Sequence, residues 1–250
     1  MKKYFNKIMD IGEQMLVCGA EVHRVEDSME RMCSAIGFVK TDVFIITSSM
    51  VVTVYTAEDS YTQTRRIKGI GMDIEKLHRL NDLSRKICEQ NLSEQDISIE
   101  LNGIKLLKRS PLWLECLSYM LISGSFTLFF GGNVIEATVS ALIGLALSII
   151  THFSEKAFLN KIFAKFIGAF AVTLGAYVLM KLGAIHVMDK VIIGNIMLLI
   201  PGVGLTNALR DLLVGDNIAG LIRLIEAVLL ALAIAAGYFL FVFLMGGIMI

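Results

Sequence analysis

Two groups of residues in this sequence carry side chains that could do chemistry. The first is near the N-terminus, where Cys18, His23 and Ser28 could form a nucleophile-and-base set of a hydrolase, with Asp42 nearby in the sequence. On an ideal helix Cys18 and His23 lie about 140° apart, because five steps of about 100° separate them, so they meet only if Gly19 bends the chain. The spacing therefore favours a buried thiol and an ordinary histidine over a catalytic pair.

The second group surrounds the stretch LLIPGVGLTNALRDLLVGD, residues 198–216. Arg210 and Asp211 end an uncharged run, and Arg223 and Glu226 follow at a spacing of three residues, so the four are expected to face one another across a helical hairpin. The 24 residues after Glu226 are uncharged, which predicts that Glu226 lies inside a membrane boundary. Ionisable groups there are costly unless they pair or face a cavity, which makes them candidates for a transport path.

The uncharged run Val191–Leu209 is long enough to cross a bilayer, yet Pro201 interrupts it. Proline has no N–H to donate, so the carbonyl of Met197 is expected to lose its helical partner. A kinked segment followed by polar rows at a spacing of four residues is typical of a substrate path. The predicted path residues are Pro201, Gly202, Gly204, Thr206, Asn207, Arg210, Asp211, Arg223, Glu226 and Glu136.

Charge distribution divides the chain into two predicted domains. Of its 46 charged residues, 32 lie in positions 1–109, although the whole chain of 250 residues is 55 % hydrophobic. This indicates a water-soluble domain over residues 1–109 and a membrane domain over 110–250. The net charge is zero and residues 1–109 balance 16 basic against 16 acidic side chains, so nothing favours nucleic acid as a partner.

The N-terminal region has the pattern of a small α+β domain. Apolar residues from Phe5 to Ile36 follow helical spacing, and Gly19 is expected to divide them into two helices. Residues 41–57 and 61–69 are typical of two or three short antiparallel strands. Asp73 and Ser93 are predicted N-caps of two further helices.

The pattern of residues 110–250 predicts an α-helical bundle of five transmembrane helices. They are expected over residues 112–130, 134–151, 162–182, 191–209 and 222–248. Lys and Arg are more frequent in the connections after the second and fourth spans than in the connections after the first and third. The basic flank 105–109 before the first span belongs to the same side as the first set. The positive-inside rule then places the N-terminal domain in the cytoplasm and the C-terminus outside a cell inner (plasma) membrane. The first 25 residues lack the apolar segment of a signal peptide.

The sequence predicts neither a metal site nor a cofactor. The four cysteines (Cys18, Cys33, Cys88, Cys116) show no Cys-x-x-Cys spacing. The later histidines (His78, His152, His186) have no partner at ligand spacing.

Residues 198–237 contain, in order, Pro-Gly, Leu-Thr-Asn-Ala, Arg-Asp, Gly-Asp and Arg-x-x-Glu-Ala. This block resembles the C-terminal signature of the threonine/serine exporter family. The segment GEQMLVCGAEVHRVEDSMERMCSAIG is similar to that family's N-terminal segment, and GIGMDIEKLHRLNDLSRKI to its next helix. The resemblance covers essentially the whole chain. Members of the family occur as long fused chains or as split pairs, and this chain resembles the larger subunit of a split pair.

The resemblance implies export of a small polar metabolite from the cytoplasm, either a threonine- or serine-type amino acid or a dicarboxylate such as succinate. No Gly-rich nucleotide loop is present, so an ion gradient, in particular the proton gradient, is the implied driving force. The implied partner is a small second membrane subunit, with a homo-oligomer left open. Two alternatives are a membrane-anchored hydrolase that uses the region of Cys18, His23 and Ser28, and a regulatory membrane subunit that does not transport.

Overall fold

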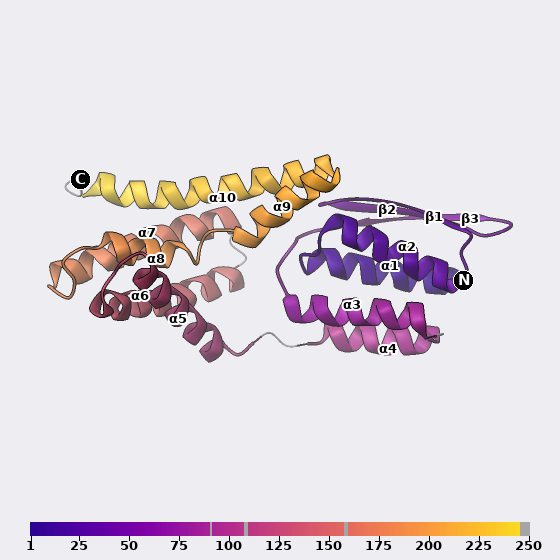
Figure 1. Cartoon of the computed structure of the whole chain (residues 1–250), viewed down its shortest axis with the longest axis horizontal. Helices are drawn as coiled ribbons and strands as arrows, with labels where there is room; N and C mark the ends of the chain where they lie inside the picture. Colours follow the sequence, from indigo (N-terminus) through magenta and orange to yellow (C-terminus); the bar gives the residue numbers. More distant parts are fainter. Residues whose placement is uncertain (91, 108–109, 158–159, 246–250) are drawn as a thin grey trace. The chain divides into compact units, whose positions relative to one another are not determined.

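The structure is a computed structural model that describes residues 1–90, 92–107, 110–157 and 160–245 (Figure 1). It divides into two compact units, Met1–Lys108 with Gly204–Leu224, and Arg109–Val203 with Ile225–Ile250. The division of the sequence at residue 109 remains a prediction, to which the structure adds that residues 204–224 belong to the same unit as the N-terminal region. Residues 108–109 of the predicted basic flank and 246–248 of the last predicted span lie outside the described residues.

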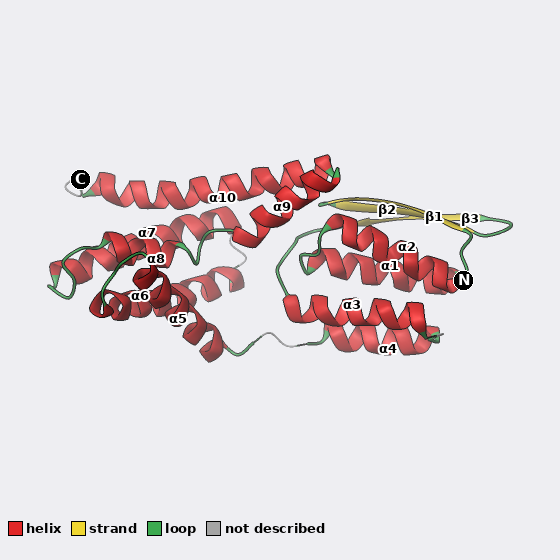
Figure 2. Ribbon diagram, viewed as in Figure 1, coloured by secondary structure: helices red, strands yellow, loops and turns green. Residues whose placement is uncertain are grey.

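The N-terminal region is α+β, as the sequence predicts (Figure 2). Its sheet is antiparallel in the order β1-β2-β3, and Ile46 pairs with Ser49, so a two-residue turn joins the first two strands. The elements are α1 (Lys2–Val17), α2 (Val22–Ile36), β1 (Lys40–Ile46), β2 (Ser49–Tyr55), β3 (Ser60–Arg66), α3 (Ile74–Glu89) and α4 (Glu94–Lys105).

Three layers enclose one apolar core in this unit. Helices α1 and α2 lie between the sheet on one side and the pair α3 and α4 on the other (Figure 1). Strand β2 turns Met50, Val52 and Val54 inward, and each of the three is fully buried, which is the alternation expected of a sheet with one covered face. The core draws on both α1 and α2, for example through Phe5 and Met29.

The predicted helix boundaries in this unit are confirmed by their caps. Gly19 separates α1 from α2 and has a φ of +91°, a left-handed conformation that glycine adopts without strain. The side chain of Asp73 accepts a hydrogen bond from the Lys76 backbone N–H at the start of α3, and that of Ser93 accepts one from Asp96 N–H at the start of α4.

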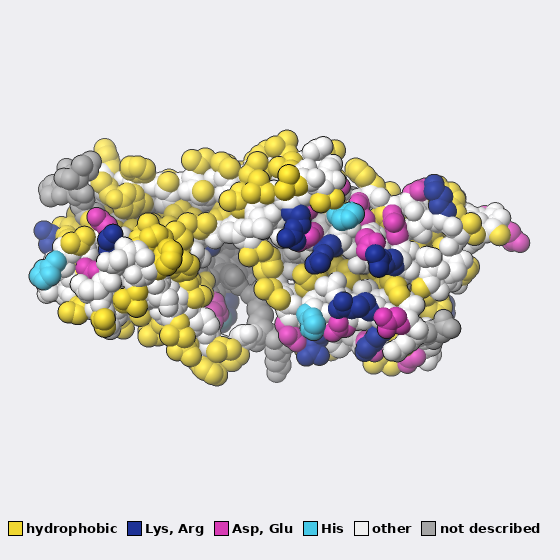
Figure 3. All heavy atoms as spheres, in the orientation of Figure 1, with side chains coloured by type: hydrophobic (Ala, Val, Ile, Leu, Met, Phe, Trp, Pro, Cys, Tyr) yellow, Lys and Arg dark blue, Asp and Glu magenta, His cyan; other side chains and the backbone are white. Residues whose placement is uncertain are grey.

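Four helices are long and apolar enough to cross a membrane. They are α5 (Leu112–Phe129), α6 (Val134–Lys156), α7 (Lys161–Lys181) and α10 (Asn217–Leu244), and they confirm four of the five predicted spans. Apolar side chains dominate the view of this part of the chain, whereas charged side chains gather over the α+β region (Figure 3).

The prediction of a fifth continuous transmembrane helix over residues 191–209 is wrong. That segment forms two shorter helices, α8 (Asp189–Ile196) and α9 (Gly202–Val214), of 8 and 13 residues. Each falls short of the ~20 residues that a membrane-spanning helix needs. The interruption lies at Pro201, where proline removes a backbone donor and the residue before it is biased away from helical geometry.

Candidate functional site

A buried ion pair joins two of the predicted path residues. Nη1 of Arg223, near the start of α10, is 2.9 Å from Oδ2 of Asp211 on α9. The two side chains are only 8 % and 1 % exposed. The pair is held by charge attraction without an aligned hydrogen bond between these two atoms. An ion pair so far removed from water is costly to form and even costlier to break on one side, so it fixes the hairpin of α9 and α10.

The same pair is bound to the N-terminal helices of its unit. Nη2 of Arg223 donates a hydrogen bond to the carbonyl of Ala20 at 2.8 Å. Asp211 accepts a hydrogen bond from the backbone N–H of Val22, the first residue of α2. Burial raises the pKa of the Asp211 carboxyl above its usual range, although Arg223 and the Val22 hydrogen bond both act to lower it.

Two further contacts hold the turn between α1 and α2. Arg210 on α9 forms an ion pair with Glu21, and Nδ2 of Asn207 lies 3.4 Å from the carbonyl of Gly19, to which it donates. A Cβ atom added at Gly19 would lie 2.7 Å from the carbonyl oxygen of Gly71, so only glycine fits this close approach. The predicted path residues Asn207 and Arg210 of α9 thus contact the turn between α1 and α2.

The predicted four-charge arrangement across the hairpin is formed only in part. Asp211 and Arg223 meet as expected, but Arg210 pairs with Glu21 of the N-terminal region. Glu226 is exposed, and no ion pair joins it to a residue that the structure describes. The pairing of Arg210 could not be foreseen from the hairpin, because Glu21 is distant in the sequence.

The remaining predicted path residues occupy different settings. Pro201 lies in the interruption, whereas Gly202, Gly204 and Thr206 form the first turns of α9. Glu136 is distant in sequence, at the start of α6, and its Oε2 accepts from the Asn133 N–H at 2.9 Å while Asn133 Oδ1 accepts from the Glu136 N–H. This reciprocal capping gives Glu136 a structural reason to be there.

A buried polar network that the sequence does not predict joins α5, α6 and α8. The Ser140 hydroxyl on α6 accepts a hydrogen bond from Nδ2 of Asn195 on α8 at 2.7 Å, and Oγ1 of Thr127 on α5 donates to it at 2.7 Å. Ser140, Thr127, Asn195 and the neighbouring Ser123 are fully buried. Such interhelical hydrogen bonds join helices within a membrane. The signal in the sequence is a single amide, Asn195, within an uncharged run.

A cluster of one histidine and two carboxylates, also not predicted from the sequence, lies in the unit that contains residues 1–108. His23 and Glu26 on α2 lie beside Asp216, which immediately precedes α10. Oε1 of Glu26 accepts from the backbone N–H of Ile45 at 3.0 Å. Burial raises the pKa of Glu26 to about 7, against the lowering effect of that hydrogen bond. The spacing of His23 and Glu26 is visible in the sequence, but the approach of Asp216 is not.

The predicted nucleophile set lacks the geometry of a hydrolase. Cys18 is 4 % exposed, and burial raises the pKa of its thiol, which disfavours the reactive thiolate. The Ser28 hydroxyl donates to the carbonyl of Arg24 at 2.7 Å, as serines in helices commonly do. Among the described residues no hydrogen bond joins any two of Cys18, His23, Ser28 and Asp42.

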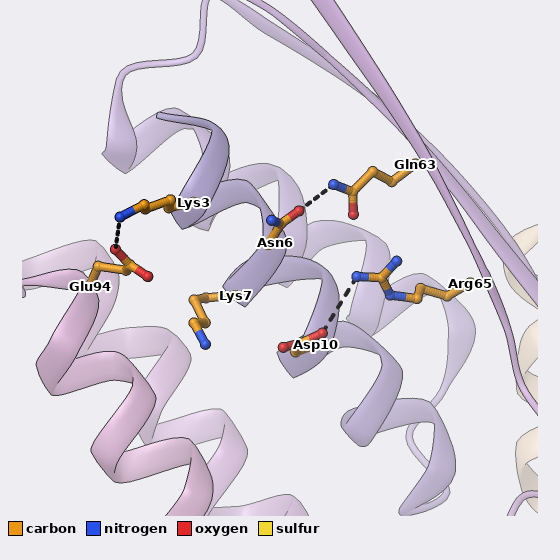
Figure 4. Close-up of a pocket in the computed structure, with 7 residues that line it drawn as sticks. All are labelled: Lys3, Asn6, Lys7, Asp10, Gln63, Arg65 and Glu94. Carbon is orange, nitrogen blue, oxygen red and sulfur yellow. Dashed lines mark hydrogen bonds and ion pairs between the residues drawn. The ribbon is translucent and has the colours of Figure 1, made fainter.

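A shallow polar cavity of about 440 Å³ lies between α1, β3 and α4 (Figure 4). In it Asn6 accepts a hydrogen bond from Gln63, Asp10 lies 3.6 Å from Arg65, and Glu94 lies 3.9 Å from Lys3. Lys3 and Glu94 form one ion pair in it, and Asp10 and Arg65 form another. We assign it no role.

The class of protein follows from these features: it is a multi-pass membrane protein with an α+β region and a helical segment interrupted at Pro201. A family model described as "Putative threonine/serine exporter" (ThrE) matches residues 6–245. The chain therefore belongs to the threonine/serine exporter family, as the resemblance of its motifs indicates.

Similar proteins carry different names. A protein of Klebsiella aerogenes named "Probable succinate transporter subunit YjjP" is 26 % identical over 228 residues, which cover 89 % of this chain and 86 % of that protein. Two proteins named "Pheromone-regulated membrane protein 10", from Kluyveromyces lactis and Eremothecium gossypii, are each 23 % identical over 92 % of this chain. The chain spans 25 % and 32 % of the lengths of these fungal proteins. No solved structure matches the chain.

Proposed function

We propose that this chain is a subunit of a secondary transporter that exports a small polar metabolite from the cytoplasm. The substrate class is a threonine- or serine-type amino acid or a dicarboxylate such as succinate, and the proton gradient drives export. Family membership supports export, and the name of the Klebsiella aerogenes relative supports a dicarboxylate and a multi-subunit assembly.

The observation that carries the proposal is the buried pair of Asp211 and Arg223, in which Asp211 lies on α9, the helix that begins after the interruption at Pro201. Secondary transporters commonly bind substrate where a membrane helix is broken, because the exposed helix ends and nearby charges face a cavity there. A guanidinium is a natural partner for a carboxylate substrate, and a carboxylate for the ammonium group of an amino acid. The buried pair supplies both charges, the guanidinium of Arg223 and the carboxylate of Asp211.

The proposed path consists of the residues at the break and along α9, with the charges of the hairpin and of α6. Arg210 and Arg223 would attract the substrate carboxylate, and Glu226, which is exposed, would be available to carry a proton. The full set is Pro201, Gly202, Gly204, Thr206, Asn207, Arg210, Asp211, Arg223, Glu226 and Glu136.

The proposed orientation has the N-terminal domain in the cytoplasm and the C-terminus outside, as the distribution of Lys and Arg predicts. Residues 204–224 share one compact unit with residues 1–108, so both segments belong on the same side of the membrane. Helices α5, α6 and α7 supply three crossings, so in this orientation the interrupted segment that contains α8 returns the chain to that side without forming a continuous transmembrane helix. Helix α10 then carries the C-terminus across.

We further propose that a small second membrane subunit completes the transporter, while a second copy of this chain remains an alternative. Many secondary transporters are built from paired inverted repeats, and four spans plus a broken segment do not supply two matching halves. A partner would also cover the apolar residues exposed on the hairpin, which include Leu209, Leu213 and Leu221.

Reconstitution into liposomes tests the proposal. Liposomes loaded with serine, threonine or succinate should show efflux driven by a pH gradient when the chain and a small subunit are both present, and little with the chain alone. Arg210→Ala and Glu226→Gln should abolish efflux, whereas the exposed pair on α3 offers matched controls, Arg79→Ala and Glu75→Gln, that should not.

Two results would contradict the proposal. Efflux that stays at the wild-type rate in both path variants would reduce those charges to markers of helix ends. Absence of efflux for all three substrates with both subunits present would favour the regulatory alternative, and hydrolysis abolished by Cys18→Ala would favour the enzymatic one.

A further inference from the structure

Three potential metal ligands from distant parts of the sequence converge in the N-terminal unit. His23 and Glu26 are three residues apart on α2, so they lie on the same face of that helix. Asp216 joins them from the turn before α10. One imidazole nitrogen and one oxygen of each carboxylate all lie within 4.8 Å of one another.

A second observation indicates that this cluster is suited to hold a cation. Oδ2 of Asp216 is buried and has no hydrogen-bond partner among the residues that the structure describes. A buried carboxylate oxygen without a donor or a positive charge is unfavourable. The two arginines nearest in the hairpin are engaged elsewhere, Arg210 with Glu21 and Arg223 with Asp211.

Glu26 is already oriented for a ligand role. Its Oε1 accepts the hydrogen bond from the Ile45 backbone N–H, which fixes the carboxylate between α2 and β1. Backbone donors of this kind commonly hold ligating carboxylates in position from outside the metal sphere. The second oxygen, Oε2, can then face the cluster.

We infer that His23, Glu26 and Asp216 form a binding site for a divalent transition-metal ion of the Zn²⁺ or Mn²⁺ type. Imidazole nitrogen favours such ions over Mg²⁺ and Ca²⁺, and two carboxylates supply the compensating charge. Ligand atoms about 2.1 Å from a tetrahedral ion lie about 3.4 Å apart, so closure requires only small side-chain movements. His23 is exposed and can make them.

A metal at this site would tie α2 to the turn between α9 and α10. That turn separates the two helices that carry Asp211 and Arg223, so the ion would strengthen the attachment that these residues make to the turn between α1 and α2. The inference rests on the geometry of one compact unit and does not require that the protein transports.

Metal binding to the purified full chain tests the inference. The protein is prepared in detergent with an affinity tag that contains no histidine, treated with a chelator and dialysed. Zn²⁺, Mn²⁺ and Mg²⁺ are then titrated by calorimetry, with the bound metal counted by elemental mass spectrometry. We expect one Zn²⁺ or Mn²⁺ per chain and a melting temperature that rises with the metal concentration.

The variants are chosen to retain the fold. His23→Gln changes an exposed side chain, Asp216→Asn keeps the shape of the carboxylate, and Glu26→Gln can still accept the hydrogen bond from Ile45. Each should weaken binding by at least about 100-fold, the upper end of what loss of an outer-shell partner alone causes. His78→Gln is the matched control, because His78 lies on α3 beside Asp82, and it should bind like the wild type.

Three outcomes would overturn the inference. The first is a wild-type chain that binds neither Zn²⁺ nor Mn²⁺. The second is a preference for Mg²⁺. The third is unchanged affinity in His23→Gln, the variant least able to disturb folding.

Discussion

Replacing Arg223 by methionine should destabilise the N-terminal unit strongly. The substitution keeps much of the side-chain volume but removes the ion pair with Asp211 and the hydrogen bond to the Ala20 carbonyl. Removing one partner of a buried ion pair costs about 3–5 kcal/mol, because the remaining charge stays buried without compensation. For a chain of this size the melting temperature should fall by roughly 6 to 20 °C.

The pH dependence of that loss follows from the pKa of Asp211. Burial holds this pKa above its unfolded value, so the folded state binds more protons and the contribution of Asp211 to stability falls as pH rises between the two values. Arg223 lowers the pKa of Asp211, so its removal raises that pKa further in the folded variant. The difference in melting temperature between Arg223→Met and wild type should therefore shrink when the pH is lowered from neutrality.

Thermal unfolding of the detergent-solubilised chain, followed by far-ultraviolet circular dichroism, measures both effects. A double-mutant cycle of Arg223→Met, Asp211→Asn and the variant with both changes should give an interaction free energy of about 0.5–3 kcal/mol between the two side chains. Arg79→Met, which breaks the exposed pair with Glu75, should change stability by less than about 1 kcal/mol. If Arg223→Met melts like Arg79→Met, or if the two single changes in the cycle simply add, the buried pair does not hold the unit together.

Three further predictions test other parts of the structure. Gly19→Ala should destabilise the unit by about 1–3 kcal/mol, because φ is +91° there and the new Cβ would meet the Gly71 carbonyl. In the same thermal assay Gly69→Ala, which has open space around it, should be near neutral. Maleimide labelling of the native chain, read by peptide mass spectrometry, should modify the exposed Cys88 but spare Cys33, whose burial raises its pKa to about 12; rapid labelling of Cys33 would contradict its burial. Ser140→Ala should cost about 0.6–2 kcal/mol in unfolding measured in mixed micelles, because it removes the hydroxyl that links Asn195 to Thr127, and unchanged stability would show that the network does not join these helices.

Local patterns in the sequence predict most of the α+β region. The caps at Asp73 and Ser93, the division at Gly19 and the three strands depend on residues close to one another in the chain. Four of the transmembrane helices could also be predicted from the sequence, because length and hydropathy alone define them. The fifth could not be judged in this way, because an uncharged run satisfies the length criterion whether or not Pro201 divides it.

The site was less predictable, because tertiary contacts choose the partners of its charged residues. The pairing of Asp211 with Arg223 follows from one hairpin and could be expected from spacing. The pairing of Arg210 with Glu21, and the approach of Asp216 to His23 and Glu26, join segments from opposite ends of the sequence. No periodicity encodes such contacts, and an exposed Glu226 cannot be distinguished from a paired one by its neighbours in the sequence.

The discontinuous make-up of the N-terminal unit has a consequence for biosynthesis. Residues 204–224 leave the ribosome only after three hydrophobic helices have been synthesised, yet Ala219 belongs to the same apolar core as Phe5, and Arg223 binds the Ala20 carbonyl. A nascent or truncated chain therefore exposes part of that core and leaves the turn between α1 and α2 without these partners. Completion of the unit becomes a late step in assembly, which occurs only in chains whose membrane helices have returned residues 204–224 to the side that holds residues 1–108. Incompletely inserted chains would present an open core to chaperones and proteases.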